Sequence, residues 1–249
     1  MKKIYIIQLL ILFFFIFIWQ ILSDNNIINS FIFSSPKKVI VCLYNLYKSN
    51  HLIGHILVTL KETIIAFFLS IIISLLISLF FYEFRIIFKI IEPYLTIINS
   101  MPKVALGPLI IILFGANQNS IITTALSITL ILNILTFYNG FINVDNYLLK
   151  YLKSLNASKT DILKYLVFPS AYSTIINSLK INISMTLIGV IMGEFLVSKE
   201  GIGYLIIYGT QVFNLTLVIS GIVLLLILSY ILYIIICYIE KLLNKKISN

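Results

Sequence analysis

Side chains that could carry out bond chemistry are few in this sequence, and they do not cluster. It contains two histidines, two cysteines and nine acidic residues. His51 and His55 stand one helical turn apart, but a metal site would need further ligands. A glycine-rich phosphate loop of the Walker A type and a pair of catalytic carboxylates are also missing from the sequence. We therefore expect no catalytic residue, no metal site and no cofactor held by this chain.

The composition identifies the class of protein. Hydrophobic residues make up 60% of the 249 residues, charged residues make up 11%, and the mean hydropathy is +1.07. These values exclude a soluble domain and indicate an integral membrane protein. The net charge of +9 needs no nucleic acid to explain it, because cytoplasmic loops of membrane proteins are rich in cations and face anionic lipid.

The apolar blocks predict an all-α protein with about six transmembrane helices. Residues 23–56 are mixed in character and predict an exposed loop with one or two short interfacial helices. Residues 86–115 are too long for one straight span, so Pro93, Pro102 and Pro108 are expected to bend the chain, with residues 86–97 at the interface. The predicted spans are residues 5–22, 57–81, 98–115, 120–141, 174–197 and 215–239.

Six spans place both termini on one side, and the basic residues choose that side. Eleven lysines and arginines fall on one face and four on the other, which makes the first face cytoplasmic. Cys42 and Cys237 then lie at opposite faces and cannot form a disulfide. The first set is Lys2, Lys3, Arg85, Lys89, Lys150, Lys153, Lys159, Lys164, Lys241, Lys245 and Lys246, and the second is Lys37, Lys38, Lys48 and Lys199.

Glu194 is an acid inside the predicted span 174–197, and such a carboxylate is usually paired or functional. Lys180 is fourteen residues earlier, roughly 21 Å away along a helix, so it cannot be the partner within that span. We interpret Glu194 first as a group near the outer mouth that holds a re-entrant turn containing Gly201 and Gly203, and second as a substrate contact.

Residues 141–172 are a polar, lysine-bearing interruption of the apolar sequence. Apolar residues at helical spacing indicate two short helices separated by residues 156–158. Asn156 is expected to be left-handed at the end of the first helix. Ser158 and Asp161 resemble a capping box that opens the second helix, and Pro169 should stop or kink it. The pattern alone fits either a docking loop for a soluble partner or an ordinary solvated loop.

This loop resembles the cytoplasmic EAA loop of binding-protein-dependent ABC importer permeases. LNAS stands where LGAS is usual, with Asn156 at the glycine position, and VFPSA matches the family's ending. Other segments resemble the nitrate, sulfonate and taurine branch: Ser35-Pro36, TLKETIIAFFLS, EPYLTIINSMPKVALGPLIIILFG and GEFLVSKEGIGYLI. The resemblance implies one transmembrane permease domain over residues 1–249, with its core at about 50–240 and a type I importer fold.

The resemblance also implies a role. Two copies would form a pore in a bacterial inner membrane, a separate ATPase dimer would bind ATP and receive the 141–172 loop, and an extracytoplasmic binding protein would deliver a small organic anion or a vitamin precursor. The candidates for the translocation pathway or its gate are Pro102, Pro108, Glu194, Gly201 and Gly203. We interpret these residues first as structural positions. The expected coupling residues are Ser154, Leu155, Asn156, Ala157, Ser158, Asp161 and Pro169.

Two positions depart from the family pattern. Lys150, Tyr151 and Leu152 replace the Glu-Ala-Ala triplet, so the surface that meets the ATPase has changed. Glu62 stands where many relatives carry arginine, a reversal of charge without a physical account at this point.

An ion-coupled secondary transporter is the alternative function, although the two halves of the sequence show no internal repeat. A lipid-modifying enzyme would need a cluster of reactive groups at one depth.

Overall fold

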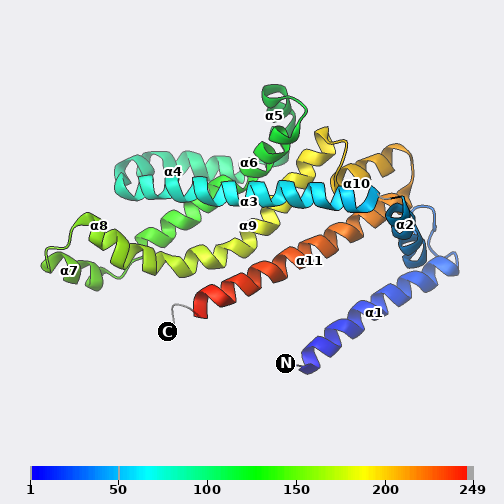
Figure 1. The fold of residues 1–249 in the computed structure, drawn as a ribbon, viewed down its shortest axis with the longest axis horizontal. Coiled ribbons are helices and arrows are strands. Elements are labelled where there is room, and N and C mark those ends of the chain that lie inside the picture. Colours follow the sequence, from blue (N-terminus) through cyan, green and yellow to red (C-terminus); the bar gives the residue numbers. More distant parts are fainter. Residues whose placement is uncertain (1, 50, 246–249) are drawn as a thin grey trace. The chain divides into compact units, whose positions relative to one another are not determined.

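The computed structural model describes residues 2–49 and 51–245, and this part of the chain is helical throughout, without strands (Figure 1). The elements are α1 (Lys2–Asp24), α2 (Pro36–Lys48), α3 (His51–Glu83), α4 (Arg85–Ser100), η1 (Lys103–Leu106), α5 (Gly107–Phe114), α6 (Gln118–Ile142), α7 (Asn146–Ser154), α8 (Lys159–Ile162), the π-helical turn η2 (Leu163–Val167), α9 (Phe168–Val197), α10 (Ile202–Gln211) and α11 (Leu215–Lys245). The predicted all-α class is confirmed, and α2 is the expected short helix after the first span.

Among the described residues, five helical segments are long and apolar enough to cross a membrane, and a sixth crossing exists only as a bent pair. The five are α1, α3, α6, the continuous stretch from α8 through α9, and α11. The bent pair is Arg85–Ser100 with Lys103–Phe114, whose axes differ by 93°. The prediction of about six spans is therefore met, provided that the bent pair counts as one.

The prediction of one continuous helix over residues 98–115 is wrong. The break lies at Met101, which is extended at φ −67° and ψ 147°, the conformation that a following proline favours. After Pro102 the chain makes one 3₁₀ turn and an α-helix of eight residues, roughly 12 Å long, which is too short to cross a bilayer alone. Pro93 does not break the helix, because α4 continues through it.

The described residues fall into two compact units. Unit 1 contains those of residues 1–59 and 199–228, and unit 2 contains those of residues 60–198 and 229–249. The core of unit 2 is the pairing of α6 with α9, which run alongside each other (Figure 1). Gly189 and Gly193 of α9 face Ala125 and Ile121 of α6, and the small residues let the two backbones approach closely.

Serine hydroxyls join α3 to the same pair inside unit 2. Ser74 Oγ donates to the Leu130 carbonyl at 3.3 Å, and Ser78 Oγ donates to the Ile134 carbonyl at 3.0 Å. Ser70 Oγ donates to Asn182 Oδ1 of α9 at 3.2 Å. All three serines are fully buried, so each hydroxyl must find its acceptor within the protein. Their spacing of four residues puts them on one face of α3.

Candidate functional site

The turn between α7 and α8 is fixed by its own backbone. Asn156 has φ 56°, in the left-handed region, as predicted. Its N–H donates to the Lys153 carbonyl at 3.1 Å, and the Ala157 N–H donates to the Leu152 carbonyl at 3.1 Å. These two bonds form a Schellman motif, which satisfies the last carbonyls of α7. The chain therefore leaves α7 in one defined direction.

The predicted capping box at the start of α8 is also confirmed. The Asp161 N–H donates to Ser158 Oγ at 3.2 Å, and the Ser158 N–H donates to Asp161 Oδ2 at 3.0 Å. Hydrogen bonds from the Ser158 hydroxyl and backbone N–H hold the pKa of the exposed Asp161 carboxyl below its ordinary value. Asp161 is thus an ionised cap at the positive end of the helix.

Pro169 does not stop the second helix, which corrects that part of the prediction made for it. Residues 163–167 form a π-helical turn, in which the Phe168 N–H reaches back five residues to the Leu163 carbonyl. The wider turn accommodates the proline ring at the start of α9, and the helix continues from Lys159 to Val197. Those 39 residues would be roughly 58 Å long, so the end that carries α8 must project beyond the membrane.

The inner face of the loop is anchored on unit 2. Leu149, Leu152 and Ala157 pack against a buried cluster that includes Phe137 and Phe141 of α6. Lys159 Nζ also lies 2.9 Å from Glu83 Oε1, at the end of α3. A movement of the loop must therefore be felt directly by α3 and α6. This anchoring is what a part that transmits motion into the helices requires.

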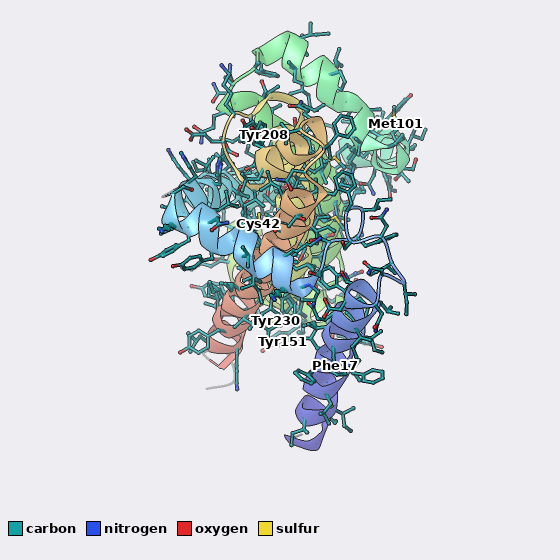
Figure 2. All side chains as sticks on the ribbon, turned by 90° about the vertical axis from the view of Figure 1, so that its right-hand side faces the viewer. Phe17, Cys42, Met101, Tyr151, Tyr208 and Tyr230 are labelled. Atoms are coloured by element: carbon teal, nitrogen blue, oxygen red, sulfur yellow. The ribbon has the colours of Figure 1, made fainter. Side chains whose placement is uncertain are left out.

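The outer face of the loop presents large side chains to solvent. Tyr147 is 82% exposed and Tyr151, labelled in Figure 2, is 61% exposed. Exposed aromatic side chains grouped on one surface are typical of protein-binding sites. We define the loop face as Tyr147, Leu148, Tyr151, Leu155 and Tyr165. Of the predicted coupling residues, Leu155 alone belongs to it, while Ser154 bonds back to the Tyr151 carbonyl.

Glu194 has a partner that sequence reasoning did not identify. Its side chain is fully buried in α9, beside the side chain of Glu62, which is 3% exposed. Two ionised carboxylates side by side in a buried site repel each other, so we infer a hydrogen bond in which the two groups share one proton. Glu62, the residue that departs from the family pattern, is thus half of a buried carboxyl pair. A role of Glu194 at the turn of Gly201 or at the substrate stays a prediction.

The glycine turn of unit 1 is held by side chains from the first residues of α3. Gly201 has φ 104°, which other residues rarely adopt, and its N–H donates to His55 Nδ1 at 3.0 Å. The next N–H, of Ile202, donates to Thr59 Oγ1 at 2.8 Å. Gly203 follows inside α10, whose ten residues are too few to cross a bilayer. His55 therefore orients a turn, and the described residues contain no cluster of potential metal ligands.

Pro102 lies at the bend between α4 and α5, as its first interpretation predicted, whereas Pro108 lies in the first turn of α5, beyond the bend. Lys103 stabilises this bend, because its Nζ donates to Asn99 Oδ1 at 2.8 Å and to the Ile128 carbonyl of α6 at 3.0 Å. Gly107 lets Leu196 approach, since a β-carbon there would lie 2.4 Å from Leu196 Cδ1. The role of Pro102 and Pro108 as lining of the translocation pathway stays a prediction.

Comparisons with known proteins agree with this architecture. Residues 66–248 match the protein family described as "Binding-protein-dependent transport system inner membrane component". A probable ABC transporter permease protein of Haemophilus influenzae is 28% identical over 216 residues, which cover 87% of either chain. The riboflavin transport system permease RibX of Chloroflexus aurantiacus is 29% identical over 86% of this chain and 80% of its own. A putative aliphatic sulfonates transport permease, SsuC of Bacillus subtilis, is 23% identical over 83% of this chain and 75% of its own.

Solved structures show the same fold. The MetNI methionine ABC transporter, in an inward-facing conformation, matches with a TM-score of 0.64 and 18% identity over 75% of this chain and 93% of that chain. An amino acid ABC transporter solved with histidines matches with a TM-score of 0.60 and 16% identity, over 82% of this chain and 97% of that chain. The helices of this chain are therefore arranged as in the permeases of ABC importers.

Proposed function

The chain belongs to the family of binding-protein-dependent transport system inner membrane components, and on that premise we propose that two copies of it form the translocation pathway of an ATP-driven importer. As a permease subunit it binds substrate in passing and breaks no bond. ATP is bound and hydrolysed by a separate ATPase dimer, so this chain needs no cofactor. An extracytoplasmic binding protein delivers the substrate. Both termini and the loop face lie on the cytoplasmic side.

The observation that carries the proposal is the rigid loop between α6 and α9. Its turn is fixed by the left-handed Asn156 and by the capping box of Ser158 and Asp161. Its inner face is packed on α6, while its outer face exposes Tyr147 and Tyr151. A rigid element with one anchored face and one open face can pass the motion of a soluble partner to the membrane helices.

The altered triplet fits this proposal if the partner has a groove for an aromatic side chain. Tyr151 takes the place of a small residue, and its ring is available for burial. Large aromatic side chains at the centre of an interface contribute much of its binding free energy. We therefore propose that Tyr151 inserts into the ATPase, where relatives are expected to make a flatter contact.

The substrate is proposed as a small organic anion or a vitamin precursor. The relatives named for a cargo include permeases for aliphatic sulfonates, riboflavin and formylaminopyrimidine. All three cargoes are small polar molecules. The binding protein selects among such cargoes. The ligand is therefore best identified in the binding protein that serves this permease.

The test is to purify the full-length chain through a C-terminal tag from its native membrane and identify the proteins that accompany it. We expect an ATPase with a Walker A motif, and we expect its yield to fall roughly thirtyfold in Tyr151→Ala, as loss of an aromatic hot spot predicts. The matched control is Tyr44→Ala, an equally exposed tyrosine on α2, which should leave the yield unchanged.

Three outcomes would overturn parts of the proposal. Equal ATPase yields from Tyr151→Ala and Tyr44→Ala would remove the proposed contact while leaving the importer intact. A purified chain without any ATPase, under conditions that preserve a control importer, would remove the coupling. Uptake into vesicles that follows an ion gradient and ignores ATP would favour the alternative, an ion-coupled transporter.

A further inference from the structure

A cavity of about 920 Å³ lies within unit 1, lined by the end of α1, by α2 along its length and by the start of α11. This volume is in the range of about 300–1,000 Å³ that is typical of small-molecule sites. Its lining is dominated by hydroxyl, amide and charged side chains, including Ser23, Asn26, Lys37 and Lys38. None of these residues belongs to the loop, the bend or the carboxyl pair described above.

The charges around this cavity favour an anion. Lys37 and Lys38 line it together with one carboxylate, Asp24, which accepts from Gln20 Nε2 at 2.8 Å. Lys38 Nζ is held by neutral acceptors, the hydroxyl of Ser30 at 2.9 Å and its carbonyl at 3.3 Å. The ion pairs found among the described residues do not include either lysine. Two cations thus face one acid, and the cavity keeps a net positive charge.

The first turn of α2 does not itself supply the anion site. Its Lys37 N–H donates to Gln20 Oε1 at 3.1 Å, and its Lys38 N–H donates to Ser35 Oγ at 3.3 Å. These backbone donors are therefore occupied, and recognition of an anion must come from the lysine side chains. Lysine ammonium groups bind phosphate as point charges, without the fixed geometry of arginine.

An apolar groove continues directly from this cavity. It has a volume of about 340 Å³, runs beside α1 and α2, and shares Gln20, Lys37 and Val41 with the cavity. Its other walls are Phe13, Ile16, Phe17, Pro36 and Ile40. Figure 2 labels Phe17 on α1 and Cys42 on α2, the helices that border the groove and the cavity.

The position of both features along α1 matches a membrane interface. α1 is an apolar helix whose large side chains are mostly exposed, so within a bilayer they meet lipid. Its apolar run ends at Trp19, Gln20 and Asp24, and tryptophan is enriched at the level of lipid headgroups. We therefore expect the cavity to lie at headgroup depth and the groove, which contains Phe13 and Phe17, to extend from it toward the acyl chains.

We propose that unit 1 carries a binding site for a phospholipid with a net negative headgroup, its phosphate beside Lys37 and Lys38 and an acyl chain in the groove of α1 and α2. Basic cavities at membrane helices are recognised sites for anionic headgroups. A soluble anion would use the cavity and leave the groove empty. A phospholipid uses both, which is the feature that selects this ligand.

The first test is native mass spectrometry of the purified, delipidated full-length chain with phosphatidylglycerol or phosphatidylcholine of the same acyl chains. We expect more phosphatidylglycerol adducts, and we expect the double variant Lys37→Ala/Lys38→Ala to lose them by roughly tenfold or more. Lys48→Ala is the matched control, because it removes a lysine from the same helix outside the cavity. Lys37→Arg/Lys38→Arg should retain the lipid and shows that loss is not a folding defect.

The second test uses the native Cys42, which lines the cavity, in a Cys237→Ser background. Phosphatidylglycerol should slow maleimide labelling of Cys42 and phosphatidylcholine should not. Ile40→Ser, in the groove, should weaken this protection, while Tyr44→Ser, outside it, should not.

Each opposite result overturns the proposal. Equal adducts of both lipids, or equal loss in Lys48→Ala, would mean that the lysines do not select a headgroup. Competition by inorganic phosphate without any effect of Ile40→Ser would assign the cavity to a soluble anion. Protection of Cys42 only in the presence of the binding protein or a second copy of the chain would assign the surface to a protein contact.

Discussion

Lys180 of α9 and Glu240 of α11 form an ion pair, with 2.6 Å between Nζ and Oε2. The lysine side chain is 31% exposed and the glutamate side chain 13%, so solvent screens the pair only in part. Sequence reasoning excluded Glu194 as the partner of Lys180 but could not name Glu240, because the pairing depends on how two distant helices meet. The pair ties the last helix of the chain to the α6 and α9 core of unit 2.

We expect Lys180→Ala and Glu240→Ala each to lower the melting temperature of the detergent-purified protein by a few degrees, because each leaves a half-buried charge without its partner. The double alanine variant should cost less than the sum of the two. The matched control is Lys159 with Glu83, a pair of similar length whose side chains are 86% and 46% exposed, where the same cycle should show little coupling. Strict additivity at Lys180 and Glu240 would contradict the contact.

Gly189 sets the separation of α6 and α9. A β-carbon there would lie 2.5 Å from the Cα of Ala125, a backbone atom that cannot move aside alone. We expect Gly189→Ala to force the helices apart and to lower the free energy of unfolding by about 1–3 kcal/mol. Gly54→Ala is the control, because nothing lies within 4 Å of its β-carbon. It should be neutral or stabilising by about 1 kcal/mol or less, since alanine is the better helix former. Similar melting temperatures for both variants would argue against this packing.

The hydrogen bond between Glu62 and Glu194 should be visible as a protonated carboxyl group. Infrared spectroscopy of the wild-type protein at neutral pH should show the carbonyl band of a buried, protonated carboxylic acid. Glu62→Gln and Glu194→Gln should each abolish that band, because an amide can donate to the carboxylate that remains. Both should keep the melting temperature close to that of the wild type. By contrast, Glu62→Ala removes the bond and should cost about 1–3 kcal/mol. A wild-type spectrum without the band would refute the shared proton.

Local features of the loop could be predicted from the sequence because their causes lie within a few residues. Asn156 had to end a helix before a turn, and Ser158 had to cap the next one, so their conformations follow from the local pattern of residues. Pro169 shows the limit of this reasoning. A proline has more than one compatible environment, and the π-helical turn that accommodates it has no clear sequence signal.

Features that depend on tertiary contacts were less predictable. Pro93, Pro102 and Pro108 are equivalent as sequence signals, yet the helix breaks at Met101 and Pro102 and continues through Pro93. The partner of Glu194 lies more than 130 residues away along the chain, at Glu62. The spacing of four residues between Ser70, Ser74 and Ser78 is a usable sequence signal for a polar helix contact, but the acceptors of these hydroxyls follow only from the tertiary structure.

The turn at Asn156 gives the most direct link between a backbone angle and transport. At φ 56°, valine would be strained by roughly 1–2 kcal/mol, whereas glycine adopts this conformation freely. We expect Asn156→Val to reach the membrane in normal amounts but to lose most uptake, and Asn156→Gly to transport at least as well as the wild type. The control is Asn146→Val, an exposed asparagine in the first turn of α7, which should leave uptake unchanged. Uptake is measured in cells that lack the native permease, with membrane amounts fixed by immunoblot. Because only the loop geometry differs between the valine and glycine variants, equal uptake by both would mean that the direction in which the chain leaves α7 does not govern coupling.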